Sequence, residues 1–509
     1  MSKPVSSLAR TEPEFEVLII GTGFSGLCMA IRLKKAGIHS FVALEKAREV
    51  GGVWRDNEYP GCACDVGSHL YSFSFAPNPE WSRKFSSQPE IFAYLKNCAD
   101  KYGLRPHIRL NTEMIEAVYD GSGDFWRVRT RDGKIFTARS VVSGMGGLNR
   151  PAYPKIPGLE SFAGVSFHSS EWLHDYDLKG KVVGVIGTGA SAIQFVPEIA
   201  PKVERLYLFQ RTPPWVLPKP DRPFSEFERK RFRWFPLYRW AFRKLIYWRN
   251  EYNARGFLNP EFMESAGVEV RKYLEKAVPD PELRAKVTPD YLIGCKRILL
   301  ANNYYPALAR PNVDLVTDLI QEIRPHSVVT KDGVERKVDA LIYGTGFRGT
   351  DRLSPARVIG RDGVCLNDAW RIGNKAYLEG YLGVAVAGYP NWFMLAGPNS
   401  GAGHTSLVFI IEAQVNYIMK CIRILRNRKM RAIEVKQEAQ DAFNRELHER
   451  LSKTVWATGC TSRYLDEQGK NTILWPGFTF QYWARIRTVN ESDYEMTATG
   501  WPAVNKAAD

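Results

Sequence analysis

The chain has 509 residues, with 70 Lys and Arg against 55 Asp and Glu, which gives a formal net charge of +15 at pH 7. This length is too great for a single hydrophobic core, so we expect two or three domains. Residues 1–14 contain no apolar signal-peptide core and no unbroken apolar run of about 18 residues follows, so the sequence predicts neither secretion nor a membrane span but a cytoplasmic protein.

The eight cysteines are scattered along the chain and show no spacing typical of metal ligands. Cys62 and Cys64 lack the separation of the redox-active pair in disulfide reductases. We therefore expect reduced structural thiols and no metal site.

The first predicted strand, 15–20, runs into the glycine-rich turn G-T-G-F-S-G and then into a helical pattern over 27–35. The first glycine allows a tight turn, the second lets the backbone approach a pyrophosphate, and the third lets the helix pack closely on the strand. The helix N-terminus then faces the phosphates. The contacts predicted for this turn are Gly21, Gly23, Phe24, Ser25 and Gly26.

A second apolar run, 41–44, ends in Glu45, at the spacing where a carboxylate accepts hydrogen bonds from a ribose. An acid at this place favours an unphosphorylated adenosine ribose, as in FAD. Residues 51–65 follow and read G-G-V-W-R-D-N-E-Y-P-G-C-A-C-D. Its glycines permit a close approach to the flavin, its tryptophan supplies a rigid wall, and its last residue supplies a negative charge. The predicted cofactor contacts are Gly52, Val53, Trp54, Tyr59 and Asp65.

The proline-rich stretch 150–158 is predicted to be a hinge, after which a strand over 181–186 enters a second glycine-rich turn. The third glycine of this turn is replaced by Ala192, and a helical pattern follows over 193–199. The next predicted strand, 205–209, leads to an arginine instead of an acid. An arginine without a carboxylate favours a 2′-phosphate, and so NADPH over NADH, whereas a surface arginine after an edge strand is the alternative. The predicted contacts are Gly187, Thr188, Gly189, Ala190, Ser191, Arg211 and Thr212.

The most basic stretch, 229–249, interleaves Arg and Lys with eight aromatic residues. Such a helix could lie in a lipid interface, which leaves a weak association with a membrane surface open. The alternative is an inserted helix whose aromatic side chains pack on the body of the protein. No RNA-binding signature accompanies the stretch, so we expect no nucleic-acid partner.

Further along, 338–347 has the form of a buried strand that ends in a glycine turn, and 392–400 has a similar form on the FAD side. The sequence thus predicts an α/β fold with two dinucleotide-binding, Rossmann-like domains and a helical insertion. The predicted segments are 1–150 and 386–509 for the FAD-binding domain, 151–217 and 291–385 for the NADPH-binding domain, and 218–290 for the insertion.

Residues 162–172 read F-x-G-x-x-x-H-x-x-x-W, which resembles the fingerprint of flavin-dependent Baeyer–Villiger monooxygenases. Residues 51–65 match a second motif of that family, and 338–347 is similar to a segment shared by flavoproteins with two dinucleotides, with Gly344 in place of the usual alanine. The resemblance implies that His168 and Trp172 couple NADPH binding to the orientation of the domains.

The family resemblance also implies roles for the pair Lys296-Arg297. Arg297 is expected over the flavin, where it would stabilise a C4a-peroxyflavin and then an oxyanion while Asp65 positions it, and Lys296 is expected to turn toward the 2′-phosphate. The implied reaction uses FAD, NADPH and O2 to convert a small hydrophobic ketone to an ester or lactone. At Arg463, relatives often carry tryptophan, so no role is transferred to that residue.

Two other functions stay open at this point. The first is a flavin monooxygenase that oxygenates nitrogen or sulfur, against which Trp172 and Asp65 argue. The second is a membrane-peripheral or sensor flavoprotein without turnover, which only the basic aromatic stretch favours. The identity of the ketone and the oligomeric state do not follow from the sequence.

Overall fold

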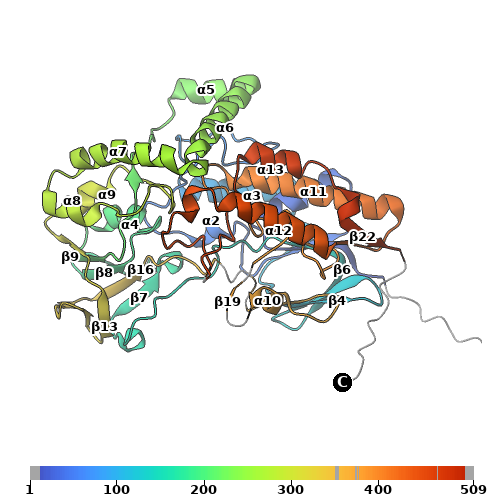
Figure 1. Cartoon of the computed structure of the whole chain (residues 1–509), viewed down its shortest axis with the longest axis horizontal. Helices are drawn as coiled ribbons and strands as arrows, with labels where there is room; N and C mark the ends of the chain where they lie inside the picture. Colours follow the sequence, from blue (N-terminus) through green and yellow to red (C-terminus); the bar gives the residue numbers. More distant parts are fainter. Residues whose placement is uncertain are drawn as a thin grey trace, which may run out of the picture.

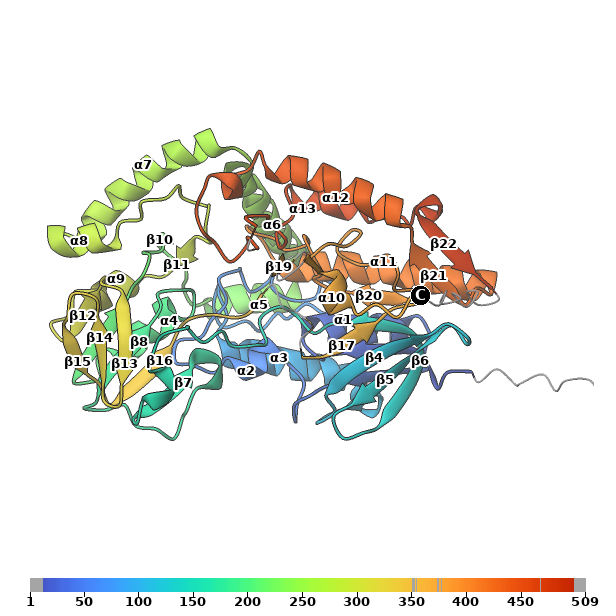
Figure 2. The same cartoon turned by 60° about the horizontal axis from the view of Figure 1, so that its bottom comes forward.

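Figure 1 shows the computed structural model, which describes residues 12–349, 353, 355–372, 375–376, 378–466 and 468–498. Two β-sheets form the centres of two units that lie apart in Figure 2. The ends of the predicted FAD-binding segments, 1–11 and 499–509, lie outside the described residues. The α/β fold class and the two dinucleotide-binding units are confirmed.

The first unit is built on a sheet of eight strands, in the order β17-β4-β5-β6-β1-β2-β3, with β20 also pairing with β6. β1 is parallel to β2, β6 to β1 and β20 to β6, whereas β4, β5 and β6 are antiparallel neighbours. The strands are β1 Phe15–Ile20, β2 Phe41–Leu44, β3 Ile108–Arg109, β4 Met114–Asp120, β5 Phe125–Thr130, β6 Ile135–Ser143, β17 Arg357–Ile359 and β20 Trp392–Met394.

Both faces of β1 are buried, because side chains of a strand alternate between the two faces of its sheet. Val17 and Ile19 join the larger core under helices α1 Phe24–Lys35, α3 Gln88–Lys101 and α11 Leu407–Arg428. Leu18 and Ile20 join a second core on the opposite face. β1, which leads into the first glycine turn, is therefore packed on both faces of the sheet, and α1 lies on one of these faces.

The second unit has a parallel sheet in the order β12-β9-β8-β16-β7. α4 Ala192–Ile199 and α9 Tyr304–Leu308 pack against it, and a small antiparallel sheet lies beside it. The strands are β7 Val165–His168, β8 Val182–Ile186, β9 Arg205–Phe209, β12 Val313–Val316, β13 Ile320–Arg324, β14 Ser327–Thr330, β15 Glu335–Lys337 and β16 Ala340–Tyr343.

Four helices, α5 Glu226–Trp234, α6 Pro236–Leu258, α7 Pro260–Ala277 and α8 Pro281–Val287, occupy most of the segment predicted to be a helical insertion. Three of them begin with proline, which is favoured at the first helical position. Asn259 and Asp280 cap α7 and α8 by accepting hydrogen bonds from backbone N–H groups. In Figure 1, α5 and α6 stand above the rest of the chain.

After α11 the chain stays with the first unit and forms α12 Gln437–Leu451 and α13 Thr479–Arg485. Within the described residues, no helix is long and apolar enough to cross a membrane. The remaining elements are α2 Val53–Asp56, α10 Leu366–Ala369, β10 Val216–Leu217, β11 Leu299–Leu300, β18 Arg371–Ile372, β19 Lys375–Ala376, β21 Ala432–Val435, β22 Tyr494–Thr497 and the short 3₁₀ helices Arg105–His107, Leu159–Ser161, Ser169–Glu171, Val455–Ala457 and Glu491–Asp493.

The expectation that all cysteines are reduced is wrong. Cys295 and Cys460 form a disulfide across 165 residues of sequence, with a Cα–Cα distance of 6.3 Å. Only tertiary structure could reveal this pair, because nothing in the local spacing of either cysteine marks it. The other six cysteines are free and buried.

Candidate active site

The first glycine turn joins β1 directly to α1 and leaves no space for larger residues. A Cβ atom on Gly26 would lie 1.8 Å from the carbonyl oxygen of Gly21, and Gly21 itself has a φ of +87°. Among the residues that the structure describes, no side chain caps the N-terminus of α1, so its first N–H groups are available to a phosphate. A Cβ on Gly23 would lie 3.7 Å from the Cα atom of Gly52, so the two glycine-rich segments face each other. These features fit the pyrophosphate of FAD.

Four residues of this turn, Thr22, Phe24, Ser25 and Gly26, are buried in the protein. Phe24 makes edge contacts with Tyr71 and Phe73 at centroid distances of 5.1 and 5.3 Å, and Ser25 is also buried. A cofactor contact of Phe24 stays a prediction.

Glu45 lies at the end of β2, next to the turn, as the spacing predicted. Its Oε2 atom accepts hydrogen bonds from the N–H and the hydroxyl of Thr22 at 2.9 and 2.7 Å. Its Oε1 atom lies 3.1 Å from Nη1 of Arg55. Sequence reasoning missed Arg55, although it stands inside the 51–65 motif. The arginine links the carboxylate to residues 51–65, so Glu45 and this glycine-rich segment are held together. A contact of Glu45 with a ribose stays a prediction.

Residues 51–65 form hydrogen bonds with a helix of the second unit. The Tyr59 hydroxyl donates to the side-chain oxygen of Gln194 at 3.0 Å, and the Gln194 amide donates to the carbonyl of Ala63 at 2.9 Å. Gln194 lies on α4, one residue before Phe195, whose ring is 6.0 Å from that of Tyr59. No motif marked Gln194. Its contacts connect the predicted FAD segment to the helix that follows the second glycine turn, while a cofactor contact of Tyr59 stays a prediction.

Trp54 and its neighbours form the short helix α2. The Trp54 indole N–H donates to the Tyr71 hydroxyl at 3.1 Å, and the two rings meet edge to face at 5.6 Å. Val53 and Gly52 precede it, and Gly52 has a φ of +54°, which favours glycine. The indole is therefore held in one orientation, as a rigid wall requires.

Arg297 and Asp65, which are 232 residues apart in sequence, form an ion pair. Both Nε and Nη2 of Arg297 donate to Oδ2 of Asp65, at 3.0 and 2.5 Å. Burial alone would raise the pKa of Asp65, but the charge and hydrogen bonds of Arg297 hold this pKa below its usual value. Asp65 in turn raises the pKa of Arg297. Both groups are therefore charged at neutral pH, and each side chain keeps 30% of its surface exposed.

A second cation, Lys219, lies near this pair, and sequence reasoning missed it. Its positive charge also lowers the pKa of Asp65, and its ammonium group lies 5.2 Å from the centre of the Phe85 ring. Burial lowers the pKa of Lys219 itself. The lysine follows β10 and no short motif surrounds it, so only its position in space identifies it.

The second glycine turn repeats the backbone arrangement of the first. Gly187 has a φ of +107°, and a Cβ on it would lie 2.6 Å from the carbonyl oxygen of Gly344. Thr188 donates to the carbonyl of Thr212 at 3.3 Å, which joins the turn to the end of β9. Gly189 and Ala190 are exposed and Ser191 is partly exposed, so this end of α4 is open to a ligand.

Arg211 and Lys296 come close together beyond this turn. Burial lowers the pKa of Lys296, and the positive charge of Arg211 lowers it further. The Lys296 ammonium group lies 4.5 Å from the centre of the Tyr291 ring. Two neighbouring cations repel each other and favour a ligand with more than one negative charge, which fits the 2′-phosphate of NADPH.

His168 and Trp172 lie on the second unit. His168 is fully buried at the end of β7, where its Nδ1 atom lies 2.8 Å from the Ser170 hydroxyl, and burial lowers its pKa. Trp172 packs between Phe167 and Phe195, with centroid distances of 5.1 and 5.3 Å. Trp172 thus supports α4, the helix that carries Gln194. A role of the two residues in domain coupling stays a prediction.

The disulfide ties the segment that carries Arg297 to the C-terminal part of the first unit. Cys295 precedes Arg297 by two residues, and its partner Cys460 is followed by Arg463 and Tyr464. Tyr464 is buried and lies close enough to Arg297 to influence the pKa of Arg297. Arg463 is exposed, and its guanidinium lies 5.6 Å from the centre of the Tyr464 ring.

Comparisons with known proteins agree with this geometry. The profile of the family described as "Pyridine nucleotide-disulphide oxidoreductase" matches residues 18–225. A Pseudomonas aeruginosa protein named Baeyer-Villiger monooxygenase is 49% identical, over 100% of this chain and 95% of its own length. A protein of the same name from Streptomyces coelicolor is 47% identical, over 94% of this chain and 92% of its own length.

Solved structures match the same extent of chain. An oxidised steroid monooxygenase bound to NADP is 31% identical, with a TM-score of 0.85 over 95% of this chain and 99% of that one. A cyclohexanone monooxygenase from Rhodococcus sp. Phi1 bound to NADP+ is 29% identical, with a TM-score of 0.85 over 96% of this chain and 100% of that one. The chain belongs to the family of Baeyer–Villiger monooxygenases.

Proposed function

We propose that this chain uses FAD in its first unit and NADPH in its second to convert a hydrophobic ketone to an ester or lactone, with Arg297 as the catalytic cation. The observation that carries the proposal is the ion pair of Arg297 with Asp65, because it joins the second unit to the FAD-binding segment. When bound, FAD would supply the redox chemistry: two electrons from an NADPH hydride reduce dioxygen, one oxygen atom enters the ketone and the other leaves as water.

Arg297 supplies the positive charge that an anionic oxygen needs. Its Nε and Nη2 atoms are held by Asp65, and within the described residues its Nη1 atom donates no hydrogen bond to the protein. Nη1 can therefore donate to a ligand oxygen without breaking the pair. A guanidinium that is already oriented stabilises developing negative charge without further reorganisation. Lys219 adds positive charge from a second direction.

The residues around Gly294, three positions before Arg297, favour an apolar substrate. A Cβ on Gly294 would lie 2.4 Å from Cε of Met263 and 3.3 Å from the Phe257 ring. Phe257 also stacks on Trp456 at a centroid distance of 5.8 Å. Apolar side chains exclude water and retain a hydrophobic ketone, so we propose this class of substrate.

The test replaces Arg297 by alanine and measures ester formation, NADPH consumption and bound FAD. We expect normal FAD content but a loss of ester formation by about 10² to 10³, the usual cost of removing one preorganised oxyanion donor. NADPH oxidation should continue in part, with its electrons lost to hydrogen peroxide. Arg297→Lys should restore little, because an ammonium group cannot reproduce the planar fork that Asp65 holds.

Lys296→Ala is the matched control, since it removes the adjacent cation. It should raise the KM for NADPH while the amount of ester formed per NADPH stays near that of the parent. A panel of ketones, thioethers and amines, with products identified by mass spectrometry, separates the proposed reaction from oxygenation of sulfur or nitrogen. Parental ester formation by Arg297→Ala would place the catalytic cation elsewhere.

A further inference from the structure

Helices α5 and α6 carry large apolar side chains that nothing in the described chain covers. Trp234 is 71% exposed, Leu237 77%, Trp240 57% and Trp248 56%. Exposed tryptophans in such number are unusual on a soluble surface and indicate an interaction site. We call this surface the aromatic face; its members are Phe227, Trp234, Phe235, Leu237, Trp240, Leu245, Trp248 and Tyr252, with Phe480 and Trp483 of α13.

The spacing on α6 shows that the outward residues form one stripe. Leu237, Trp240, Lys244, Trp248 and Tyr252 follow one another at intervals of three or four residues, which places them on one side of a helix. All of them except Lys244 are among the large exposed apolar residues, and Lys244 itself is also exposed.

Other aromatic residues of the same helices point inward. Phe232 and Tyr247 are buried, and Tyr238 and Phe242 pack against the larger core. One set of aromatic rings therefore attaches α6 to the protein, as the second alternative for the basic aromatic stretch expected, and another set faces solvent.

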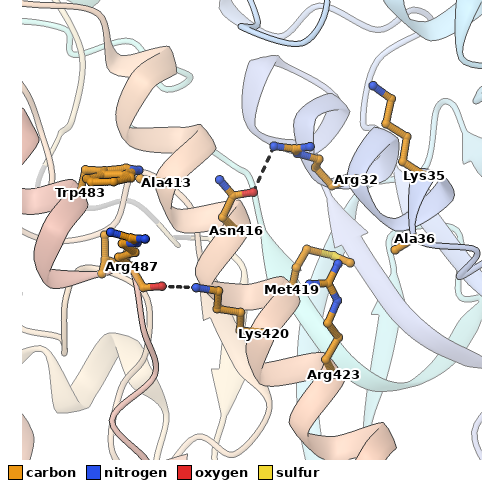
Figure 3. A pocket seen from close by; sticks show the side chains of 11 residues that line it. Arg32, Lys35, Ala36, Ala413, Asn416, Met419, Lys420, Arg423, Trp483 and Arg487 are labelled. Carbon is orange, nitrogen blue, oxygen red and sulfur yellow. Dashed lines mark hydrogen bonds between the residues drawn. The ribbon is translucent and has the colours of Figure 1, made fainter.

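The aromatic face continues onto α13 and ends at a pocket. The Trp248 ring lies 6.0 Å from the ring of Phe480, and Trp483 follows Phe480 by one helical turn. Trp483 lines a pocket of about 350 Å³ between α1, α11 and the end of α13 (Figure 3). The apolar surface and this pocket are therefore adjacent.

Five cations line the pocket, and no carboxylate does. In the part of the chain that the structure describes, none of the five forms a salt bridge. The Arg32 guanidinium donates to the Asn416 side chain at 3.2 Å, but its buried Nε atom has no hydrogen-bond partner. The cations, labelled in Figure 3, are Arg32, Lys35, Lys420, Arg423 and Arg487.

The charge of α6 has the same sign. The helix carries five cations, and its single carboxylate, Glu251, is buried and lies 3.1 Å from the Nε2 atom of His404. The outward side of α6 therefore presents aromatic rings and positive charge without negative charge. This combination is complementary to a surface that is apolar inside and anionic outside.

We propose that the aromatic face docks on an anionic lipid surface, with the cationic pocket taking up a headgroup phosphate. Tryptophan and tyrosine rings are stable at the level of the headgroups, and Lys and Arg snorkel past them toward the phosphates. Each Lys or Arg near such a surface contributes about fivefold in affinity at moderate salt. Docking of this kind needs no membrane-spanning helix.

The experiment measures sedimentation of the FAD-loaded full chain with vesicles of phosphatidylcholine, and with vesicles in which phosphatidylglycerol replaces about a third of it. We expect the anionic vesicles to bind at least about tenfold more tightly, and this binding to weaken as salt is added. No binding to anionic vesicles, or equal binding to both kinds, would overturn the proposal.

The double variant Trp240→Ser/Trp248→Ser tests the aromatic contribution. It should retain FAD and ketone turnover in solution but lose at least about tenfold in affinity for anionic vesicles. Ile135→Ser is the matched control, because Ile135 is 59% exposed on β6 in the sheet of the first unit. Unchanged binding by the double variant, or an equal loss in the control, would contradict docking through this face.

The double variant Arg423→Glu/Arg487→Glu tests the pocket. Loss of two attractions should weaken binding by about 25-fold or more, and the preference for phosphatidylglycerol should fall with it. Lys202→Glu/Lys337→Glu makes the same change in net charge at exposed places on the second unit and should bind like the parent. If the parent instead forms dimers that the tryptophan double variant dissociates, and neither protein binds vesicles, the face is a contact between two copies.

Discussion

The two glycine turns of this chain share one backbone arrangement but differ in some of their side chains. In each unit the strand leading into the turn ends beside a second parallel strand, which is followed directly by Gly144 or Gly344. A Cβ on Gly21 would lie 2.9 Å from the Gly144 oxygen, and a Cβ on Gly187 would lie 2.6 Å from the Gly344 oxygen. The first glycine of each turn is thus required by the neighbouring strand.

The two units differ at the third glycine position of the turn. α1 begins two residues before Gly26, whereas α4 begins at Ala192, the corresponding residue. Because the helix of the second unit starts later, a Cβ is accommodated at Ala192, and a Cβ on Gly344 would lie 3.3 Å from it. Ala192, which stands in place of the third glycine, and Gly344, which stands in place of the usual alanine, therefore face each other.

Charge is the second difference. The first unit places Glu45 beside its turn, where the carboxylate pairs with Thr22 and Arg55. The second unit places Arg211 and Lys296 together at the corresponding end. The same backbone arrangement is therefore followed by charges of opposite sign in the two units, and we expect this sign to select the cofactor.

The largest effect is expected where the first turn has no space. Gly26→Ala would bring its Cβ to within 1.8 Å of a backbone oxygen, so the turn must open and FAD should be lost. The ratio of flavin to protein absorbance in the purified variant measures this. Gly121→Ala is the control, since a Cβ there meets nothing within 4 Å. Full flavin occupancy in Gly26→Ala would refute the placement of the FAD site.

The disulfide joins the two units covalently, so its removal tests how far they depend on each other. Without reductant the denatured parent should show six reactive thiols of its eight cysteines. Cys460→Ser should lower the free energy of unfolding by about 2–4 kcal/mol, because a long loop is no longer closed in the unfolded chain. Thermal unfolding measures the change, with Cys365→Ser as a control that removes a free cysteine. Eight reactive thiols without reductant would show that the bond does not form.

The charge difference predicts cofactor choice. Arg211→Ala should raise the KM for NADPH by about 10- to 150-fold, which corresponds to one charge-assisted hydrogen bond of about 1.5–3 kcal/mol. The KM for NADH, which has no 2′-phosphate, should change little. Steady-state rates with both cofactors and a saturating ketone measure this. Equal losses for NADPH and NADH would mean that Arg211 does not contact the phosphate.

The smallest effect concerns the pair Ala192 and Gly344. Gly344→Ala should destabilise the second unit by about 1 kcal/mol, because the two Cβ atoms must separate. Ala192→Gly/Gly344→Ala should recover part of this loss, with a coupling energy of at least about 0.5 kcal/mol. Thermal unfolding of the parent, both single variants and the double variant completes the cycle. Strictly additive effects would show that the two residues do not compensate each other.

Local pattern predicted most of the first turn and its surroundings. The strands expected at 15–20, 41–44 and 205–209 are Phe15–Ile20, Phe41–Leu44 and Arg205–Phe209 in the structure. The expected helix at 27–35 begins earlier, at Phe24, because its first turn includes Gly26, which the pattern assigned to the glycine-rich turn. The alternation of apolar residues and the residues of a turn act over short stretches of chain. A short window of sequence therefore contains the information that places these strands and helices.

The sequence by itself therefore determined the fold class, the two glycine turns and the sign of the charge beyond each. Tertiary structure alone decided the partners that lie far apart in sequence: the bond from Cys295 to Cys460, the contact of Gln194 with residues 51–65, and the position of Lys219 beside Asp65. It also decided which aromatic rings of α6 face solvent. The physical reason is that these contacts depend on how separately specified elements pack, and no periodicity within a single element records its neighbours.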